Sequence, residues 1–89
     1  MPSSVDLSQN YPNPFNPSTK IQFSLPRSGV VTLKVYNTLG EEVASLLEGE
    51  RTAGVYTLEW NANGFASGVY FYQLKAGEYS ETKKLLLLR

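Results

Sequence analysis

Cysteine and histidine are both absent from this chain of 89 residues. Without cysteine, the chain forms no disulfide and offers no thiolate for catalysis or metal binding. Without histidine, it lacks the commonest general base at neutral pH and the commonest zinc ligand. These two absences argue against enzymatic and zinc-binding functions.

The chain also lacks an excess of charge of either sign, because eight basic residues balance eight acidic ones. Nucleic-acid binders and proteins that dock on anionic membranes both need clustered Lys and Arg. We therefore expect no nucleic-acid partner. The longest apolar run, residues 85–88, is far shorter than the roughly 20 residues of a membrane span, so we expect no direct membrane insertion. The first residues lack the basic start and apolar core of a signal peptide, and we expect such a peptide upstream in a longer parent chain.

The acidic residues that remain offer little chemistry. Asp6 is the only aspartate, and the glutamates at 41–42 and 48–50 stand beside glycines, where solvated turns are typical. Residues 59–63 give only part of the oxygen set that a calcium loop needs. An autocatalytic cross-link between lysine and asparagine needs a buried lysine, whereas Lys34 falls on the polar side of its segment. We predict no enzyme, no metal site and no cofactor.

What the sequence does contain is a period-two alternation of apolar and polar residues, typical of half-buried strands. The alternating segments are residues 19–25, 30–37, 54–61, 68–76 and 79–88. Residues 42–48 also fit one or two helical turns, but their short length and the glycines on both sides favour a strand. With a short edge strand allowed at residues 5–8, this makes about seven strands at regular spacing. We predict a single all-β domain, an immunoglobulin-like antiparallel β-sandwich.

Residues 1–18 show no such alternation. Pro12, Pro14 and Pro17 fix the backbone φ angle and remove three backbone donors, which excludes a helix. We therefore predict an irregular, proline-rich strap at residues 1–18, with Phe15 plugging one end of the sandwich. The sandwich itself takes residues 19–89, and the two parts together form one domain.

Aromatic residues suggest a second kind of site, a stacking platform for sugars. However, Tyr56 and Trp60 alternate along one predicted strand, and Tyr70 and Tyr72 along another. That arrangement is typical of a core filled by large side chains whose polar tips reach the rim. Core packing is the favoured interpretation, and a sugar platform would require Trp60 to be exposed.

Two stretches are more specific than composition explains. The first is Asn-Tyr-Pro-Asn-Pro-Phe-Asn-Pro-Ser-Thr at residues 10–19. The second is Trp60 followed by Ala-Ser-Gly-Val-Tyr-Phe-Tyr at residues 66–72, with Lys-Lys-Leu at 83–85 and Arg89 after it. From about residue 7 to residue 89, the chain resembles the type A C-terminal sorting domain of proteins exported by the type IX secretion system. Its middle section is also similar to the immunoglobulin-like part of the flagellar hook-capping protein, which as a rule lacks the proline-rich opening.

The resemblance implies that the chain is a secretion signal and not an enzyme. Members of the family stand C-terminal to a larger cargo protein in Bacteroidetes-like Gram-negative bacteria, and they fold in the periplasm. An outer-membrane translocon recognises them, and a cell-surface sortase often removes them and joins the cargo to an anionic lipopolysaccharide. The implied location is the cell surface or the medium. The alternatives are a passive structural module or a carbohydrate-binding module appended to a secreted enzyme.

The family motifs also imply which residues a partner recognises. These residues are Pro12, Asn13, Pro14 and Phe15; Gly68, Val69 and Tyr70; and Lys83, Lys84, Leu85, Leu86, Leu87, Leu88 and Arg89. Leu85 departs from the family pattern, where methionine is common, but the exchange nearly conserves volume. We expect the last strand to be a handle for strand addition by a partner. The sequence assigns no oligomeric state.

Overall fold

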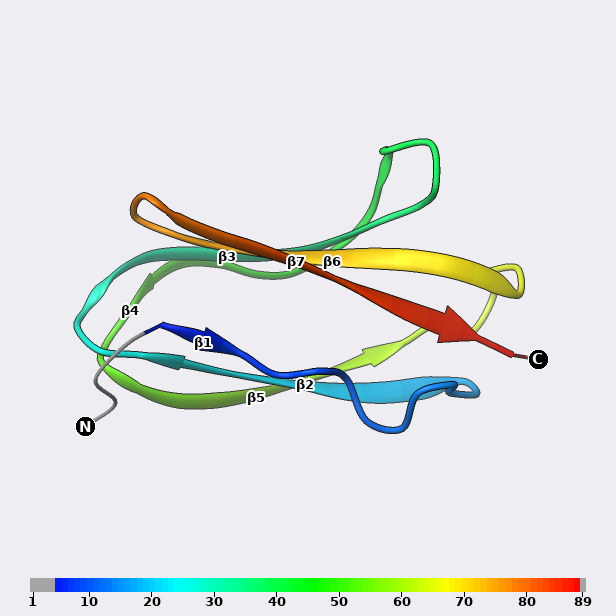
Figure 1. The fold of residues 1–89 in the computed structure, drawn as a ribbon, viewed down its shortest axis with the longest axis horizontal. Coiled ribbons are helices and arrows are strands. Elements are labelled where there is room, and N and C mark those ends of the chain that lie inside the picture. The colour runs from blue at the N-terminus through cyan, green and yellow to red at the C-terminus, as the bar shows by residue number, and fades with distance from the viewer. Residues whose placement is uncertain (1–4, 89) are drawn as a thin grey trace.

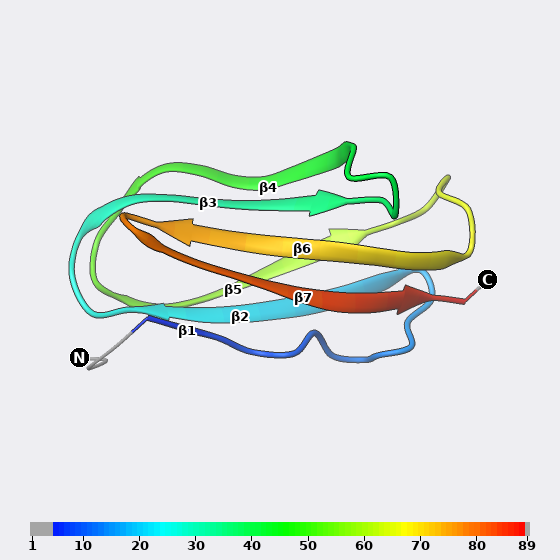
Figure 2. The ribbon, with the colours of Figure 1, turned by 45° about the horizontal axis from the view of Figure 1, so that its top comes forward.

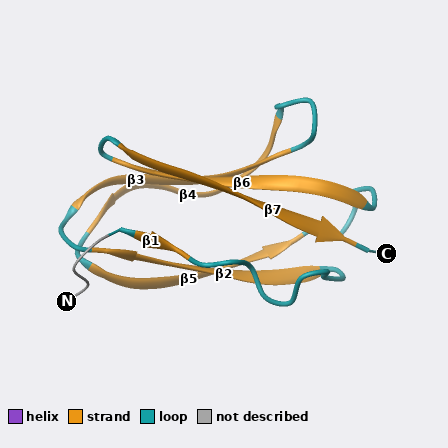
Figure 3. Cartoon of the chain, viewed as in Figure 1, coloured by secondary structure: helices purple, strands orange, loops and turns teal. Residues whose placement is uncertain are grey.

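The computed structural model describes residues 5–88, which form seven strands in two antiparallel sheets (Figures 1 and 3). The strands are β1 (Asp6–Leu7), β2 (Ser18–Leu25), β3 (Gly29–Tyr36), β4 (Glu42–Arg51), β5 (Gly54–Asn61), β6 (Gly68–Ala76) and β7 (Tyr79–Leu87). One sheet has the order β1-β2-β5 and the other the order β4-β3-β6-β7. The predicted sandwich is confirmed. The described residues include no helix with the length and apolar character needed to cross a bilayer.

The order of the larger sheet is that of an immunoglobulin-like sandwich, in which the third, sixth and seventh strands are neighbours. A second hallmark lies at the start of β6. The hydroxyl of Tyr70 donates a hydrogen bond of 2.7 Å to the carbonyl oxygen of Ala66, four residues upstream. This is the tyrosine corner that fixes the chain where it enters this strand.

The segment that fitted either a helix or a strand is a strand, β4, and it is longer than predicted because it continues to Arg51. The turn before it is built by Asn37, whose Oδ1 accepts the backbone N–H groups of Leu39 and Glu41 at 2.9 and 3.0 Å. Gly40 completes the turn with a φ of 84°, which residues with a Cβ rarely adopt. The turn folds β4 back onto β3 and excludes a helical start.

The core lies between the sheets and follows the period-two pattern. From β2, Ile21 and Phe23 are buried, and from β3, Leu33 and Val35. Both strands place every second side chain inward, as the alternation predicts. Each such side chain contributes about 1.5–3 kcal/mol through burial, and β6 and β7 add Tyr72, Leu74, Leu85 and Leu87 to the same core.

The strap connects the two sheets (Figure 2). At its start, β1 pairs with β2, and Tyr11 then forms an antiparallel bridge with Lys20 of the same strand. Further along, Phe15 forms a parallel bridge with Leu87 of β7 in the other sheet. The strap therefore passes from the smaller sheet to the larger one and closes the open side of the sandwich.

Candidate functional site

The three groups of residues that the sequence singles out meet at one end of the sandwich. In the ladder between β6 and β7, Gly68 pairs with Leu87 and Tyr70 pairs with Leu85. Phe15 of the strap lies on the other side of Leu87. The fold thus collects three separate sequence motifs around the last residues of β7, near the C-terminus in Figure 1.

Four hydrogen bonds hold the strap against the outer edge of β7. The Phe15 N–H donates to the carbonyl of Leu86, and the Leu88 N–H donates to the carbonyl of Phe15, both at 3.0 Å. The side chains add two more. Asn13 Oδ1 accepts the Leu86 N–H at 3.0 Å, and Gln9 Nε2 donates to the carbonyl of Lys84 at 2.8 Å. The edge of β7 is therefore covered at residues 84–88 by its own chain.

Phe15 anchors this arrangement. Its side chain is only 2% exposed, and its ring centroid lies 5.7 Å from that of Trp60. Trp60 in turn packs edge-on against Tyr70, with centroids 5.6 Å apart. Aromatic pairs at these distances contribute about 0.5–1.5 kcal/mol beyond area burial. The prediction that Phe15 plugs the end of the sandwich is confirmed.

A buried polar network fixes the strap just before Phe15. Asn10 is 2% exposed, and its Nδ2 donates to Thr19 Oγ1 at 3.0 Å and to the carbonyl of Pro12 at 3.1 Å. Thr19 Oγ1 also donates to the carbonyl of Pro12 at 2.9 Å. Gln9 Nε2 links this network to β7, because it contacts both Asn10 Oδ1 and the Lys84 carbonyl. The network therefore joins β2, the strap and β7.

The predicted recognition residues differ in what a partner can reach. Four are core residues: Phe15, Tyr70, Leu85 and Leu87. Four others are partly buried: Gly68, Val69, Lys83 and Leu86. Five are exposed: Pro12, Asn13, Pro14, Lys84 and Leu88. Arg89 lies outside the described residues. The motifs therefore mix residues that build this end of the sandwich with residues that face solvent.

The first half of β7 carries linked polar side chains. The Tyr79 hydroxyl donates to Glu81 Oε1, and Lys83 Nζ lies 3.2 Å from Glu81 Oε2. The hydrogen bond from Tyr79, and secondarily Lys83, lowers the pKa of the Glu81 carboxyl. The same hydrogen bond raises the pKa of Tyr79 to about 12. Charged side chains on an edge strand discourage indiscriminate pairing with other strands.

The sugar platform is contradicted by the burial of the aromatic residues. Trp60 is 3% exposed, Tyr70 8% and Tyr72 0%. These rings cannot present a face to a sugar because they pack in the core.

Lys34 lies on the polar side of its strand, as predicted. Its Nζ pairs with Glu42 at 3.3 Å and Glu48 at 3.7 Å on the outer side of the sheet. Within residues 5–88, no cluster of acidic residues suits a metal ion.

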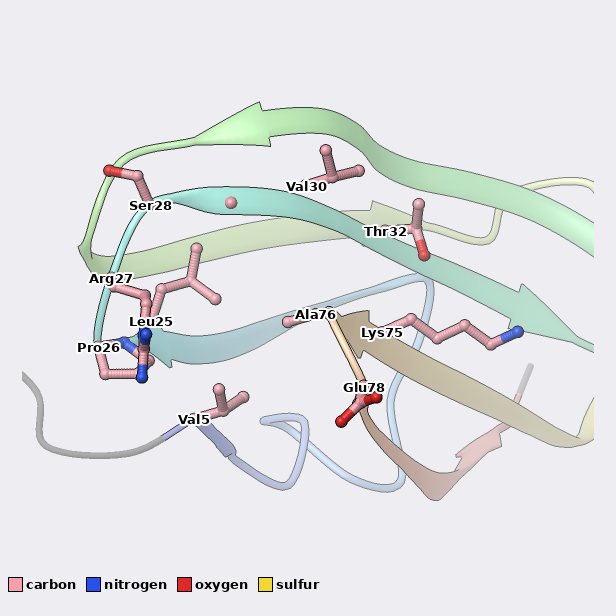
Figure 4. A pocket seen from close by; sticks show the side chains of 12 residues that line it. Val5, Leu25, Pro26, Arg27, Ser28, Val30, Thr32, Lys75, Ala76 and Glu78 are labelled. Atoms are coloured by element: carbon pink, nitrogen blue, oxygen red, sulfur yellow. The ribbon is translucent and has the colours of Figure 1, made fainter.

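An open hollow of about 780 Å³ lies at the opposite end of the sandwich (Figure 4). Its lining includes Val5 of the strap, Leu25 at the end of β2, Arg27 in the turn after it, Ala76 at the end of β6 and Glu78 in the turn between β6 and β7. The lining includes none of the residues of the three motifs. The hollow and the meeting point of the motifs are therefore separate features.

A family model described as a secretion system C-terminal sorting domain matches residues 9–88. The chain belongs to this family. The resemblance noted in the sequence is thereby confirmed, and the chain is a C-terminal sorting domain of the type IX secretion system, a family of sorting signals without catalytic activity. No curated protein matches the chain.

The sorting domain also uses residues to which the sequence analysis assigned no role. Gln9, Asn10 and Thr19 hold the strap in place, and the Tyr72 hydroxyl donates to the carbonyl of Ser8 at 2.7 Å. Hydrophobic alternation cannot find buried polar groups, because it classes Asn and Thr as surface residues. The only indication in the sequence that Asn10 and Thr19 have a structural role is their position beside the three prolines.

Proposed function

We propose that the outer-membrane translocon recognises this domain at the end where the strap, the start of β6 and the last residues of β7 meet. As a sorting domain, the chain directs a cargo protein to secretion machinery, and the cargo is secreted or displayed on the cell surface. Beyond this family role, the proposal names the translocon as the partner and one end of the sandwich as the surface that it contacts. The translocon contacts exposed residues there, above all Lys84 and Leu88, in the periplasm of a Gram-negative bacterium.

The convergence of the three motifs carries this proposal. Gly68 pairs with Leu87, and Leu87 bridges to Phe15, although these residues come from three distant parts of the chain. A motif that served folding alone would need its buried members only. Leu88 is nevertheless 51% exposed, and Lys84 is exposed as well. An exposed leucine and an exposed lysine near the end of the last strand suit a protein partner.

A cell-surface sortase is the second proposed partner. It acts after export, on the chain that precedes the folded sandwich, and separates the domain from its cargo. The hydrogen bonds of the strap to β7 fold the first part of the domain onto the last, and the proposed cleavage falls in the chain N-terminal to the strap.

An export assay tests the proposal. The domain is fused to the C-terminus of a fluorescent reporter with a signal peptide, and the fusion is expressed in a bacterium with a working type IX system and in its translocon mutant. We expect reporter on the surface or in the medium of the first strain only. Retention in the periplasm of both strains, with the domain folded, would contradict the proposal.

A matched pair of surface variants locates the recognised end. The test variant carries Lys84→Glu and Leu88→Ser, and the control carries Lys75→Glu and Val30→Ser. All four positions are exposed, but Lys75 near the end of β6 and Val30 near the start of β3 lie at the opposite end of the sandwich. We expect export to fall at least tenfold for the test variant and to stay near the parent level for the control. Equal export of both would place recognition elsewhere on the domain.

A further inference from the structure

The outer edge of β7 has a definite set of main-chain groups. In an antiparallel pair, alternate residues direct their N–H and C=O groups toward the partner strand and away from it. The strap bonds to the main chain at Lys84, Leu86 and Leu88, so the even-numbered residues of β7 face away from β6. The ladder between β6 and β7 is regular from Tyr79 to Leu87. The main-chain groups of Ser80 and Thr82 therefore point to the same outer edge.

The strap covers only part of this edge. Its contacts begin at Lys84, through the Gln9 side chain, and continue to Leu88. Before that point the strap belongs to the other sheet, because Asp6 and Leu7 pair with β2. Within residues 5–88, no strap residue hydrogen-bonds to the main chain of Ser80 or Thr82. Both residues are exposed, and the edge is bare there.

The side chains along this half of the edge define what fits beside it. Ser80, Thr82 and Lys84 lie on one face of β7 and are all exposed. Lys84 makes no ion pair with another described residue, whereas Lys83, on the opposite face, pairs with Glu81. A strand added at this edge would place its own side chains opposite this row, and opposite charges in such cross-strand positions attract. The row favours a segment with polar residues opposite Ser80 and Thr82 and an acidic residue opposite Lys84.

We propose that the outer edge of β7 at residues 80–84 is a docking edge for an extended segment of the export machinery. The inference rests on the proposed function and specifies how the partner binds. The segment adds as a further strand beside β7, pairs with the main chains of Ser80 and Thr82, and places an acidic side chain opposite Lys84. It replaces the single contact from Gln9 and leaves Phe15 in place. Affinity comes from main-chain hydrogen bonds, as in other strand additions.

A proline substitution separates main-chain pairing from recognition by side chains. Thr82→Pro removes an N–H group that faces away from β6, so the ladder within the sheet is kept, and proline is tolerated at such edge positions. A partner strand, however, loses that hydrogen bond and meets the ring. We expect export of the reporter fusion to fall at least tenfold relative to the parent domain.

Thr57→Pro is the matched control. Lys20 and Gln22 of β2 bond to the strap, so the odd-numbered residues of β2 bond to β5. Thr57 pairs with Gln22, and its N–H group therefore faces the outer edge of the smaller sheet. It is an exposed threonine on an edge strand, as Thr82 is. We expect this variant to be exported at the parent level.

The outcomes are distinguishable from failure of the proposed function. If the parent domain is not exported, the proposed function fails. If the parent and Thr82→Pro are exported equally, the docking edge is overturned while the function stands. Circular dichroism and thermal unfolding of the isolated chain verify folding, and Ser80→Pro replaces Thr82→Pro if the latter unfolds. A dimer of the isolated chain that Thr82→Pro abolishes without loss of export would assign the edge to a second copy and overturn the proposal.

Discussion

Phe15 and Leu87 lie side by side as a parallel bridge, although they come from opposite ends of the chain. Both side chains are buried, at 2% and 0% exposure. The bridge ties the strap to the last strand, so neither is a loose terminal appendage. Folding of the sandwich and assembly of the proposed recognition end therefore depend on the same contacts.

The first prediction concerns the anchor of the strap. Phe15→Ala removes a buried ring that packs on Trp60, and we expect a loss of about 3–5 kcal/mol in the free energy of unfolding. Tyr11→Ala is the control, since Tyr11 belongs to the same strap but is 80% exposed. Thermal unfolding followed by circular dichroism measures both. Similar midpoints for the two variants would show that the strap contributes little to stability.

The second prediction concerns truncation of the C-terminus. Removing residues 88–89 spares the two fully buried leucines of β7, Leu85 and Leu87, whereas removing residues 85–89 deletes them. Each buried leucine contributes about 2–5 kcal/mol, against a total stability of about 5–15 kcal/mol. We expect the shorter truncation to fold and the longer one to lose dispersed amide signals in its NMR spectrum. A folded longer truncation would show that Leu85 and Leu87 are not required for a stable core.

Truncation at residue 85 is therefore a poor test of recognition, because a loss of export would follow equally from unfolding and from removal of a recognised end. The substitutions Lys84→Glu and Leu88→Ser avoid this difficulty. Both positions are exposed, so these changes alter the surface and leave the core intact.

The local sequence pattern predicts the strands of this fold, but it does not predict that the strap contacts the last strand. Alternation predicts Ile21, Phe23, Val31 and Leu33 as core residues because each strand exposes one face to solvent and one to the other sheet. The strap has no periodicity, so nothing local indicates that Phe15 pairs with Leu87. The family motifs include most residues of the candidate site. They do not indicate that the strap already covers half of the outer edge of β7. That fact depends on contacts between distant parts of the chain.

The third prediction concerns the buried amide of Asn10. Its Nδ2 donates to Thr19 Oγ1 and to the carbonyl of Pro12, and Asn10→Ala leaves these groups with fewer partners. We expect a loss of about 1–3 kcal/mol, measured as the shift of the urea midpoint. Asn16→Ala, at an exposed position of the same strap, is the control and should shift the midpoint little.

Hydrogen exchange adds a local readout for Asn10→Ala. The amide of Leu86 donates to Asn13, and loosening of the strap should expose it to solvent. We expect faster exchange at Leu86 than in the parent domain, with less change at the central residues of β3. Uniform acceleration at all amides would indicate only a global loss of stability.

The last prediction concerns alkaline pH. Burial raises the pKa of Tyr72 to about 12, while the backbone of Asn10 acts in the opposite direction. The free phenol titrates near 10. Because the folded pKa is the higher one, Tyr72 contributes its stability fully below about pH 10 and loses it as the pH rises to about 12. Tyr79, whose pKa rises to about 12 beside Glu81, adds to the same loss.

Tyr72→Phe tests this assignment. At neutral pH the variant should be less stable by about 1 kcal/mol, since the Ser8 carbonyl loses its donor. Between pH 10 and 12 the parent domain loses the contribution of Tyr72 and the variant has none to lose, so their unfolding midpoints in urea should converge. Tyr11→Phe, at an exposed position, should follow the parent curve throughout. A constant difference between the parent and Tyr72→Phe across this range would mean that the phenol of Tyr72 does not titrate with unfolding.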